Sequence, residues 1–131
     1  MTVGLSTTNL ANSLLNTVRG TSFSNAATYV ALHTSVGDPG SAGTSNASAG
    51  STTRSAVTFA AASGGAIALT GTQPTWTNGG TSETIQYISV WSAATGGTFL
   101  WSAQLTAPKA WASGDTLTLT SCGLSLTPLA A

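Results

Sequence analysis

The first twenty residues carry apolar side chains at helical spacing. The stripe recurs at intervals of three or four residues and lies on one helix face: Leu10, Ala11, Leu14, Leu15 and Val18. Ser6 or Thr7 is suited to cap the amino end, and Gly20 is suited to end the helix. The pattern predicts a helix over residues 7–19. A helix of about four turns is marginal alone, so the stripe is expected to dock on another surface.

After residue 20 the pattern changes to short stretches rich in β-branched and aromatic residues, separated by Gly, Pro, Asn and Ser. These stretches predict about eight strands, at residues 28–34, 54–61, 66–70, 75–78, 84–92, 98–105, 116–120 and 123–127. Strands at this spacing are typical of a β-sandwich or a jelly-roll-like barrel. We therefore expect an all-β fold with one N-terminal helix: a helical arm at residues 1–20 and a single β-sandwich domain at residues 21–131.

The clearest alternation lies in the stretch from Ile85 to Trp91. Ile88 and Val90 share one face of the predicted strand, whereas Ile85, Tyr87 and Trp91 share the other. Apolar side chains on both faces indicate a central strand between two layers. The sequence WSAATGGTFL follows, and it predicts a hairpin with a Gly-containing loop in which Trp91 packs against Phe99.

Residues 35–53 form the longest segment without a predicted strand. The segment consists largely of Gly, Ser, Ala, Thr and Asn, with no aromatic residue. Loops longer than about 12–15 residues are uncommon in compact domains and are usually functional or disordered. Asp38 followed by Pro39 predicts a turn near its start. We expect a flexible loop, which either lies against a partner or is a mobile surface loop without a function.

The composition changes this picture in one respect, because the chain is nearly free of charge. Only 5% of the residues are charged and the formal net charge is zero, against about 25% charged residues in an ordinary domain. Yet 41% of the residues are hydrophobic, which is not typical of disorder. Ser and Thr make up about a third of the chain. A surface of hydroxyl groups gives little electrostatic protection against association and favours a place in an assembly.

The same composition argues against several classes of partner. Arg19, Arg54 and Lys109 are scattered, so binding to nucleic acid is not expected. No apolar run reaches the length that crosses a membrane, and the start of the chain lacks the pattern of a signal peptide. The single Cys122 has no partner for an internal disulfide. We expect a protein made in a cytoplasm.

Catalytic and metal sites are poorly supported. His33 is the only histidine, and the nucleophile motif Gly-x-Ser-x-Gly is absent. The three carboxylates, Asp38, Glu83 and Asp115, are far apart in sequence and offer neither a glycosidase pair nor metal-ligand spacing. We expect no enzyme, no catalytic residue, no metal and no cofactor. His33 is expected to be a strand residue at a sheet edge or an interior imidazole with its hydrogen bonds satisfied.

The four tryptophans suggest a different function, carbohydrate binding, since exposed indoles stack on sugar faces. In a small β-domain large aromatic side chains more often belong to the core or an interface. Trp111, beside Pro108 and Lys109 in a predicted loop, is the best candidate for an exposed indole.

Several motifs resemble those of a widespread family of small tailed-bacteriophage virion proteins, over nearly the whole chain. They are YVALHTSVGDPGSAG at 29–43, Arg54 before AVTFAAASGG at 56–65, and WSAATGGTFL at 91–100. The chain departs from the family in the loop, where Asn46 and Thr53 stand near the places of an acidic and an aromatic residue. The family is often labelled as tail-fibre or minor structural proteins, and the resemblance implies a non-enzymatic virion component.

The resemblance and the low charge together predict a capsid-surface decoration protein that binds and stabilises the major capsid protein shell as a homotrimer. Two alternatives are a tail-fibre or tail-tip protein that contacts the host surface, with a host glycan as its partner, and a stand-alone carbohydrate-binding module. The residues expected at the interface are Leu10, Leu14, Val18, Arg19, Asp38, Pro39, Asn46, Arg54 and Trp111.

Overall fold

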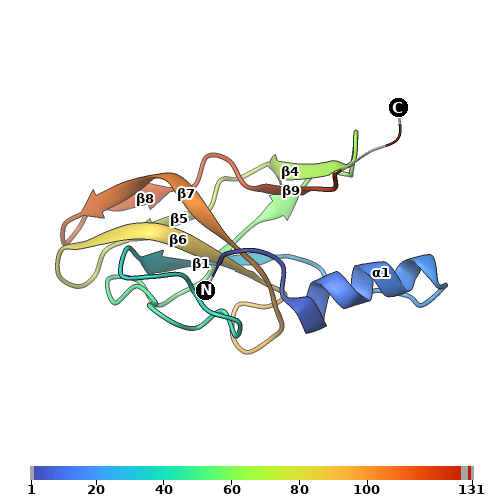
Figure 1. Cartoon of the computed structure of the whole chain (residues 1–131). Coiled ribbons are helices and arrows are strands. Elements are labelled where there is room, and N and C mark those ends of the chain that lie inside the picture. The colour runs from blue at the N-terminus through green and yellow to red at the C-terminus, as the bar shows by residue number, and fades with distance from the viewer. Residues whose placement is uncertain (1, 128–129, 131) are drawn as a thin grey trace.

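A computed structural model describes residues 2–127 and 130 of the chain, and it shows a mostly β protein with one N-terminal helix (Figure 1). The helical elements are η1 (Thr7–Ala11), a π-helical turn, and α1 (Asn12–Val18). The strands are β1 (Tyr29–Thr34), β2 (Ser55–Ala56), β3 (Thr58–Phe59), β4 (Ala66–Thr70), β5 (Thr75–Thr77), β6 (Glu83–Trp91), β7 (Phe99–Trp111), β8 (Thr116–Thr118) and β9 (Gly123–Ser125). The expected all-β class is confirmed.

The strands form antiparallel sheets that enclose a shared core. The largest sheet has the order β2-β1-β6-β7, and the smaller ones have the orders β3-β4-β9 and β5-β8. Buried side chains from both layers belong to one cluster, among them Leu32 of β1, Ile88 of β6, Trp101 of β7 and Trp76 of β5. This arrangement is sandwich-like, and the sheets do not close into a barrel.

The helix lies almost where its pattern predicts it. The Ser6 hydroxyl accepts a hydrogen bond from the Asn9 backbone N–H at 3.3 Å and so caps the amino end. Only the first half of the apolar stripe docks, because Leu10 belongs to the core while Leu15 is 68% exposed and Val18 is 87% exposed. Figure 1 shows α1 projecting beyond the sheets at the end of the molecule away from β8.

One predicted strand is divided between two sheets. The stretch 54–61, expected as a single strand, forms β2, which pairs with β1, and β3, which pairs with β4. Val57 lies between these two pairs and is buried in the core. The chain therefore changes layers at Val57, a step that hydrophobic alternation does not reveal.

Strand β7 is longer than expected and runs through Pro108. It lies at the end of its sheet, where a strand residue without an N–H is tolerated. Tyr87 pairs with Gln104 but Ile85 pairs with Lys109, so the residues between them bulge out of the ladder. The predicted loop around Pro108 is thus a bulge within an edge strand.

A second irregularity corrects the expected faces of the central strand. Strand β6 does lie between β1 and β7, as predicted. Its register shifts between Ile85 and Tyr87, and such a shift moves the following side chains to the other face. Ile85 consequently joins Ile88 and Val90 in one core cluster instead of facing away from them.

Candidate functional site

His33 is an interior imidazole whose two ring nitrogens are engaged. Nδ1 lies 2.7 Å from the Ser45 carbonyl oxygen, and Nε2 lies 2.7 Å from the Ser89 Oγ atom. Because a carbonyl oxygen only accepts, Nδ1 carries the proton and Nε2 accepts from the Ser89 hydroxyl. That hydroxyl also accepts a hydrogen bond from the Trp91 indole at 2.8 Å. The satisfied interior imidazole is confirmed, whereas an edge position is wrong, since β1 lies between β2 and β6.

Burial of His33 makes the fold sensitive to acid. Burial lowers the pKa of His33 from 6.5, and the hydrogen bond to Ser45 opposes this only in part. The unfolded chain therefore binds a proton more readily than the folded one, so stability falls as the pH drops below about 6.5 and through the lowered folded pKa.

We expect the free energy of unfolding of the natural chain to decrease between about pH 7 and pH 5, and that of a His33→Gln variant to change little. Urea unfolding followed by tryptophan fluorescence across this range measures both. An equal pH dependence in the two proteins would contradict the assignment, because the chain has no other histidine.

The loop at residues 35–53 is held against the sheet by hydrogen bonds along its length. Asp38 Oδ1 accepts from the Gly40 backbone N–H at 2.7 Å, which is the predicted turn. Asn46 has a positive φ of 55° and its amide donates to the Asp38 carbonyl at 2.9 Å. The backbone N–H of Thr34 donates to the Asn46 carbonyl at 2.8 Å, and that of Ser48 donates to Leu32 at 3.0 Å. The segment expected to be flexible therefore runs alongside β1 and is hydrogen-bonded to it.

The carboxylate of Glu83, at the start of β6, fastens the far end of this loop. It accepts hydrogen bonds from the Ser48 hydroxyl, from the backbone N–H groups of Ala49 and Gly50 at 3.1 Å each, and from the Trp111 indole at 3.1 Å. Burial opposes ionisation of Glu83, but these hydrogen bonds outweigh it and lower its pKa. One carboxylate therefore joins the loop, β6 and the end of β7.

Arg54 fixes the β6–β7 hairpin. Its guanidinium carbon lies 3.7 Å from the centroid of the Trp91 ring, and Nη1 donates to the carbonyls of Ala93 at 2.8 Å and Gly96 at 2.6 Å. Trp91 in turn packs on Phe99 with ring centroids 5.5 Å apart, which confirms the predicted pair. Arg54, expected at an interface, uses its charged group within the chain.

This geometry needs a planar guanidinium, so Arg54→Ala is expected to lower the free energy of unfolding by about 2 kcal/mol, and Arg54→Lys to recover less than half of that loss. Chemical denaturation of the three proteins gives the comparison. A lysine variant as stable as the natural chain would show that a positive charge alone suffices.

Three of the expected interface residues are buried in the chain itself. Trp111 is 4% exposed at the end of β7, so its expected exposure is wrong, and the other three tryptophans are buried as well. Leu10 and Pro39 are also buried. These side chains stabilise the monomer and are not available to a partner while it is folded. Of the remaining candidates, Val18, Arg19 and Asn46 are exposed.

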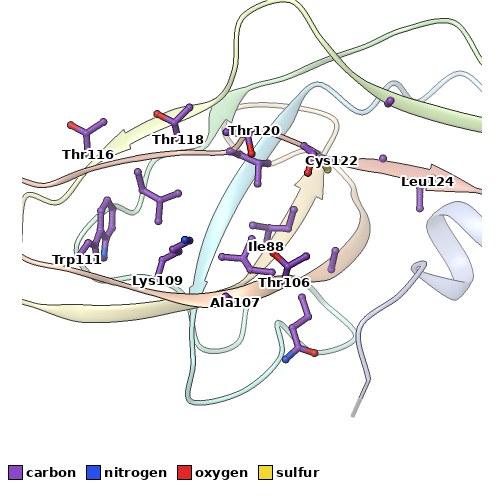
Figure 2. Close-up of a pocket in the computed structure, with 18 of the residues that line it drawn as sticks. Ile88, Thr106, Ala107, Lys109, Trp111, Thr116, Thr118, Thr120, Cys122 and Leu124 are labelled. Atoms are coloured by element: carbon purple, nitrogen blue, oxygen red, sulfur yellow. The ribbon is translucent and has the colours of Figure 1, made fainter.

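An open groove of about 840 Å³ lies between the outer half of β7 and the segment that carries β8 and β9 (Figure 2). Ile88, Leu105, Leu117 and Leu119 contribute apolar lining. Four threonines also lie along its sides: Thr106, Thr116, Thr118 and Thr120. Lys109 and Asp115 are its charged residues, and burial raises the pKa of the Cys122 thiol beside it to about 11. The sequence pattern did not predict this groove, because Pro108 indicated a loop where the second half of β7 lies.

Among residues 2–127 and 130, no group of three His, Cys, Asp or Glu side chains is placed to hold a metal ion. Within the same described residues, no helix has the length and apolarity needed to cross a membrane.

Comparison with known protein families matches residues 4–127 to the family described as Podophage GP4 fiber I protein gp80. The chain belongs to this family. The match includes the helix, the loop at 35–53 and all nine described strands. No curated protein matches the chain.

Membership of the Podophage GP4 fiber I protein gp80 family makes the chain a phage virion structural protein, as its motifs predicted. Two surfaces of this gp80-family chain are candidates for assembly contacts. They are the exposed end of α1, with Leu15 and Val18, and the groove between β7 and β8.

Proposed function

We propose that the chain is a non-enzymatic structural subunit of a bacteriophage fibre, held in the virion by contacts between proteins. The observation that carries this proposal is the family match over residues 4–127, since the family is described as a fibre protein. Few side chains among the described residues are candidates for catalysis, and their polar groups serve the fold.

The engagement of the reactive side chains supports a non-enzymatic role. His33 and Ser89 are buried and hydrogen-bonded to each other and to neighbouring groups. Glu83 is occupied by four donors. A general base must reach the proton that it abstracts, and the His33 ring has both nitrogens committed inside the protein.

The surface supports assembly into a larger particle. The chain has three basic and three acidic residues, so little electrostatic repulsion opposes close packing of copies. Leu15 and Val18 expose apolar area at the end of a projecting helix, and such area is characteristic of an interaction surface. We propose that copies associate as homotrimers. A glycan platform of tryptophans is not part of the proposal, because all four indoles are buried.

A second candidate is a capsid-surface decoration protein that binds the major capsid protein. The projecting helix favours it, because one apolar arm is enough to anchor a small β-domain on a shell and to stabilise the bound state.

Immunogold labelling of intact virions with an antibody against the chain separates the two. Gold confined to fibres at the tail is the expected result. Gold spread densely over the head would instead favour decoration, and virions without gold at either place would contradict both functions. A phage lacking this gene provides the control for antibody specificity.

A further inference from the structure

We propose that the exposed end of α1 in one copy of the chain docks into the β7–β8 groove of a second copy. The inference rests on the proposed function, because it names the surfaces through which copies associate in the virion. The groove is thus occupied by a second copy. The contact joins two different surfaces, the helix end of one protomer and the groove of the next.

The helix end is an apolar surface without a partner within the described residues. Leu10 and Leu14 pack against the core of their own chain, whereas Leu15 and Val18 lie on the outer flank of the same stripe. Side chains three apart on a helix are neighbours and present one patch. Arg19 is the only charged residue between Met1 and Gly20. This patch is suited to burial against another apolar surface.

The groove is better suited to side chains of a helix than to an added strand. Its β7 wall bulges between Gln104 and Lys109 and contains Pro108, which has no N–H to donate. Proline, lysine and bulges on an edge strand are features that prevent pairing with another strand. The half-buried Leu105 and Leu117 in its lining still offer area to aliphatic side chains such as leucine and valine.

The charges at the two surfaces are complementary. The groove carries Lys109 and Asp115. The docking helix brings Arg19 and the partly negative carbonyl end of α1. Arg19 of one copy is thus a partner for Asp115 of the next, while Lys109 suits the helix carbonyls.

The exposed end of α1 and the β8 end of the groove lie apart within one copy. Figure 1 shows α1 at the end of the molecule away from β8, which forms one wall of the groove. A contact between two different surfaces repeats from copy to copy and closes as a ring when the rotation allows it. Any closed ring satisfies all helix ends and all grooves, and the proposed homotrimer is a ring of three copies.

The natural Cys122 in the groove provides a direct test by cross-linking. A Val18→Cys variant, oxidised with copper phenanthroline, is expected to give covalent oligomers through a disulfide between the introduced thiol and Cys122 of the neighbouring copy. Adding Cys122→Ser should abolish them. Val36→Cys is the matched control, because Val36 is an equally exposed valine, at 83%, in the loop that follows β1.

Light scattering of the full chain provides the second readout. Leu15→Ser combined with Val18→Ser is expected to weaken self-association about a hundredfold, since two apolar side chains lose their burial. Both residues are exposed in the monomer, so circular dichroism should show an unchanged fold. The Val36→Ser control should associate like the natural chain.

Two results would overturn the inference. Oligomers that persist in the double serine variant without a link from position 18 to Cys122 would place the interface elsewhere. A natural chain that stays monomeric at all concentrations would exclude self-docking. Either result leaves the fibre role intact, because that role is decided independently by the position of gold on the virion.

Discussion

Glu83→Gln is expected to lower the free energy of unfolding by about 2–4 kcal/mol, although it changes one atom of a partly exposed side chain. The carboxylate only accepts hydrogen bonds, and all of its neighbours donate: the Ser48 hydroxyl, two backbone N–H groups and the Trp111 indole. A glutamine places an NH₂ group against some of these donors and leaves the indole of a buried tryptophan without a charged acceptor. Urea unfolding followed by tryptophan fluorescence measures the loss.

Gln104→Ala is a suitable control, because Gln104 lies on β7 but is exposed. Acid provides an internal check. The folded pKa of Glu83 is lowered from 4.5, so its contribution to stability is present above that value and is lost as the pH falls through the folded pKa. The Glu83→Gln variant should lack this component. If the variant and the control are equally stable, the carboxylate does not fasten the loop.

The second large effect is expected for Gly43→Ala, which should destabilise the fold by about 2–4 kcal/mol. Gly43 has a φ of 72° and is buried under the Phe99 ring, and a Cβ atom at this position would overlap that ring. Alanine therefore meets two costs, a left-handed backbone and a collision with a buried aromatic side chain.

Gly71→Ala separates the two costs. Gly71 has a φ of 69°, nearly the same backbone conformation, but nothing lies within 4 Å of an added Cβ atom. Its replacement should cost only about 1 kcal/mol. Thermal unfolding of both variants gives the difference. Equal losses would mean that the loop at 35–53 does not pack on Phe99 in solution.

The elements that sequence reasoning placed well are those that depend on local chemistry. Strand β4 has the predicted bounds at residues 66–70, and the turn at Asp38 forms through a bond between residues two apart. The Trp91–Phe99 pair follows from a short hairpin. In each case the interacting residues are close in the sequence, so the pattern contains the information.

The features that the sequence pattern did not predict depend on residues far apart in the sequence. The bonds to Glu83 join residues 28 to 35 positions away, and no local pattern in a Gly- and Ser-rich loop marks Ser48, Ala49 and Gly50 as their donors. A segment that looks flexible by composition is therefore held by one distant carboxylate.

The candidate assembly surfaces show the same limit. Hydrophobic spacing found the helix, but it did not show that Leu10 docks while Val18 projects, because this depends on where the sheets end. Pro108 suggested a loop, and only the pairing of β7 with β6 shows that Trp111 is buried and that the groove has a wall there. The type of an apolar residue alone does not determine whether its side chain packs in the core or is exposed to a partner.

Quantitative mass spectrometry of gradient-purified phage particles tests most directly whether the chain is a structural component of the virion. Peptides of this chain are expected to co-purify with intact particles in a constant ratio to the major capsid protein, and the copy number per particle is expected to be a multiple of three. Absence of the chain from particles that retain their other structural proteins would contradict the claim.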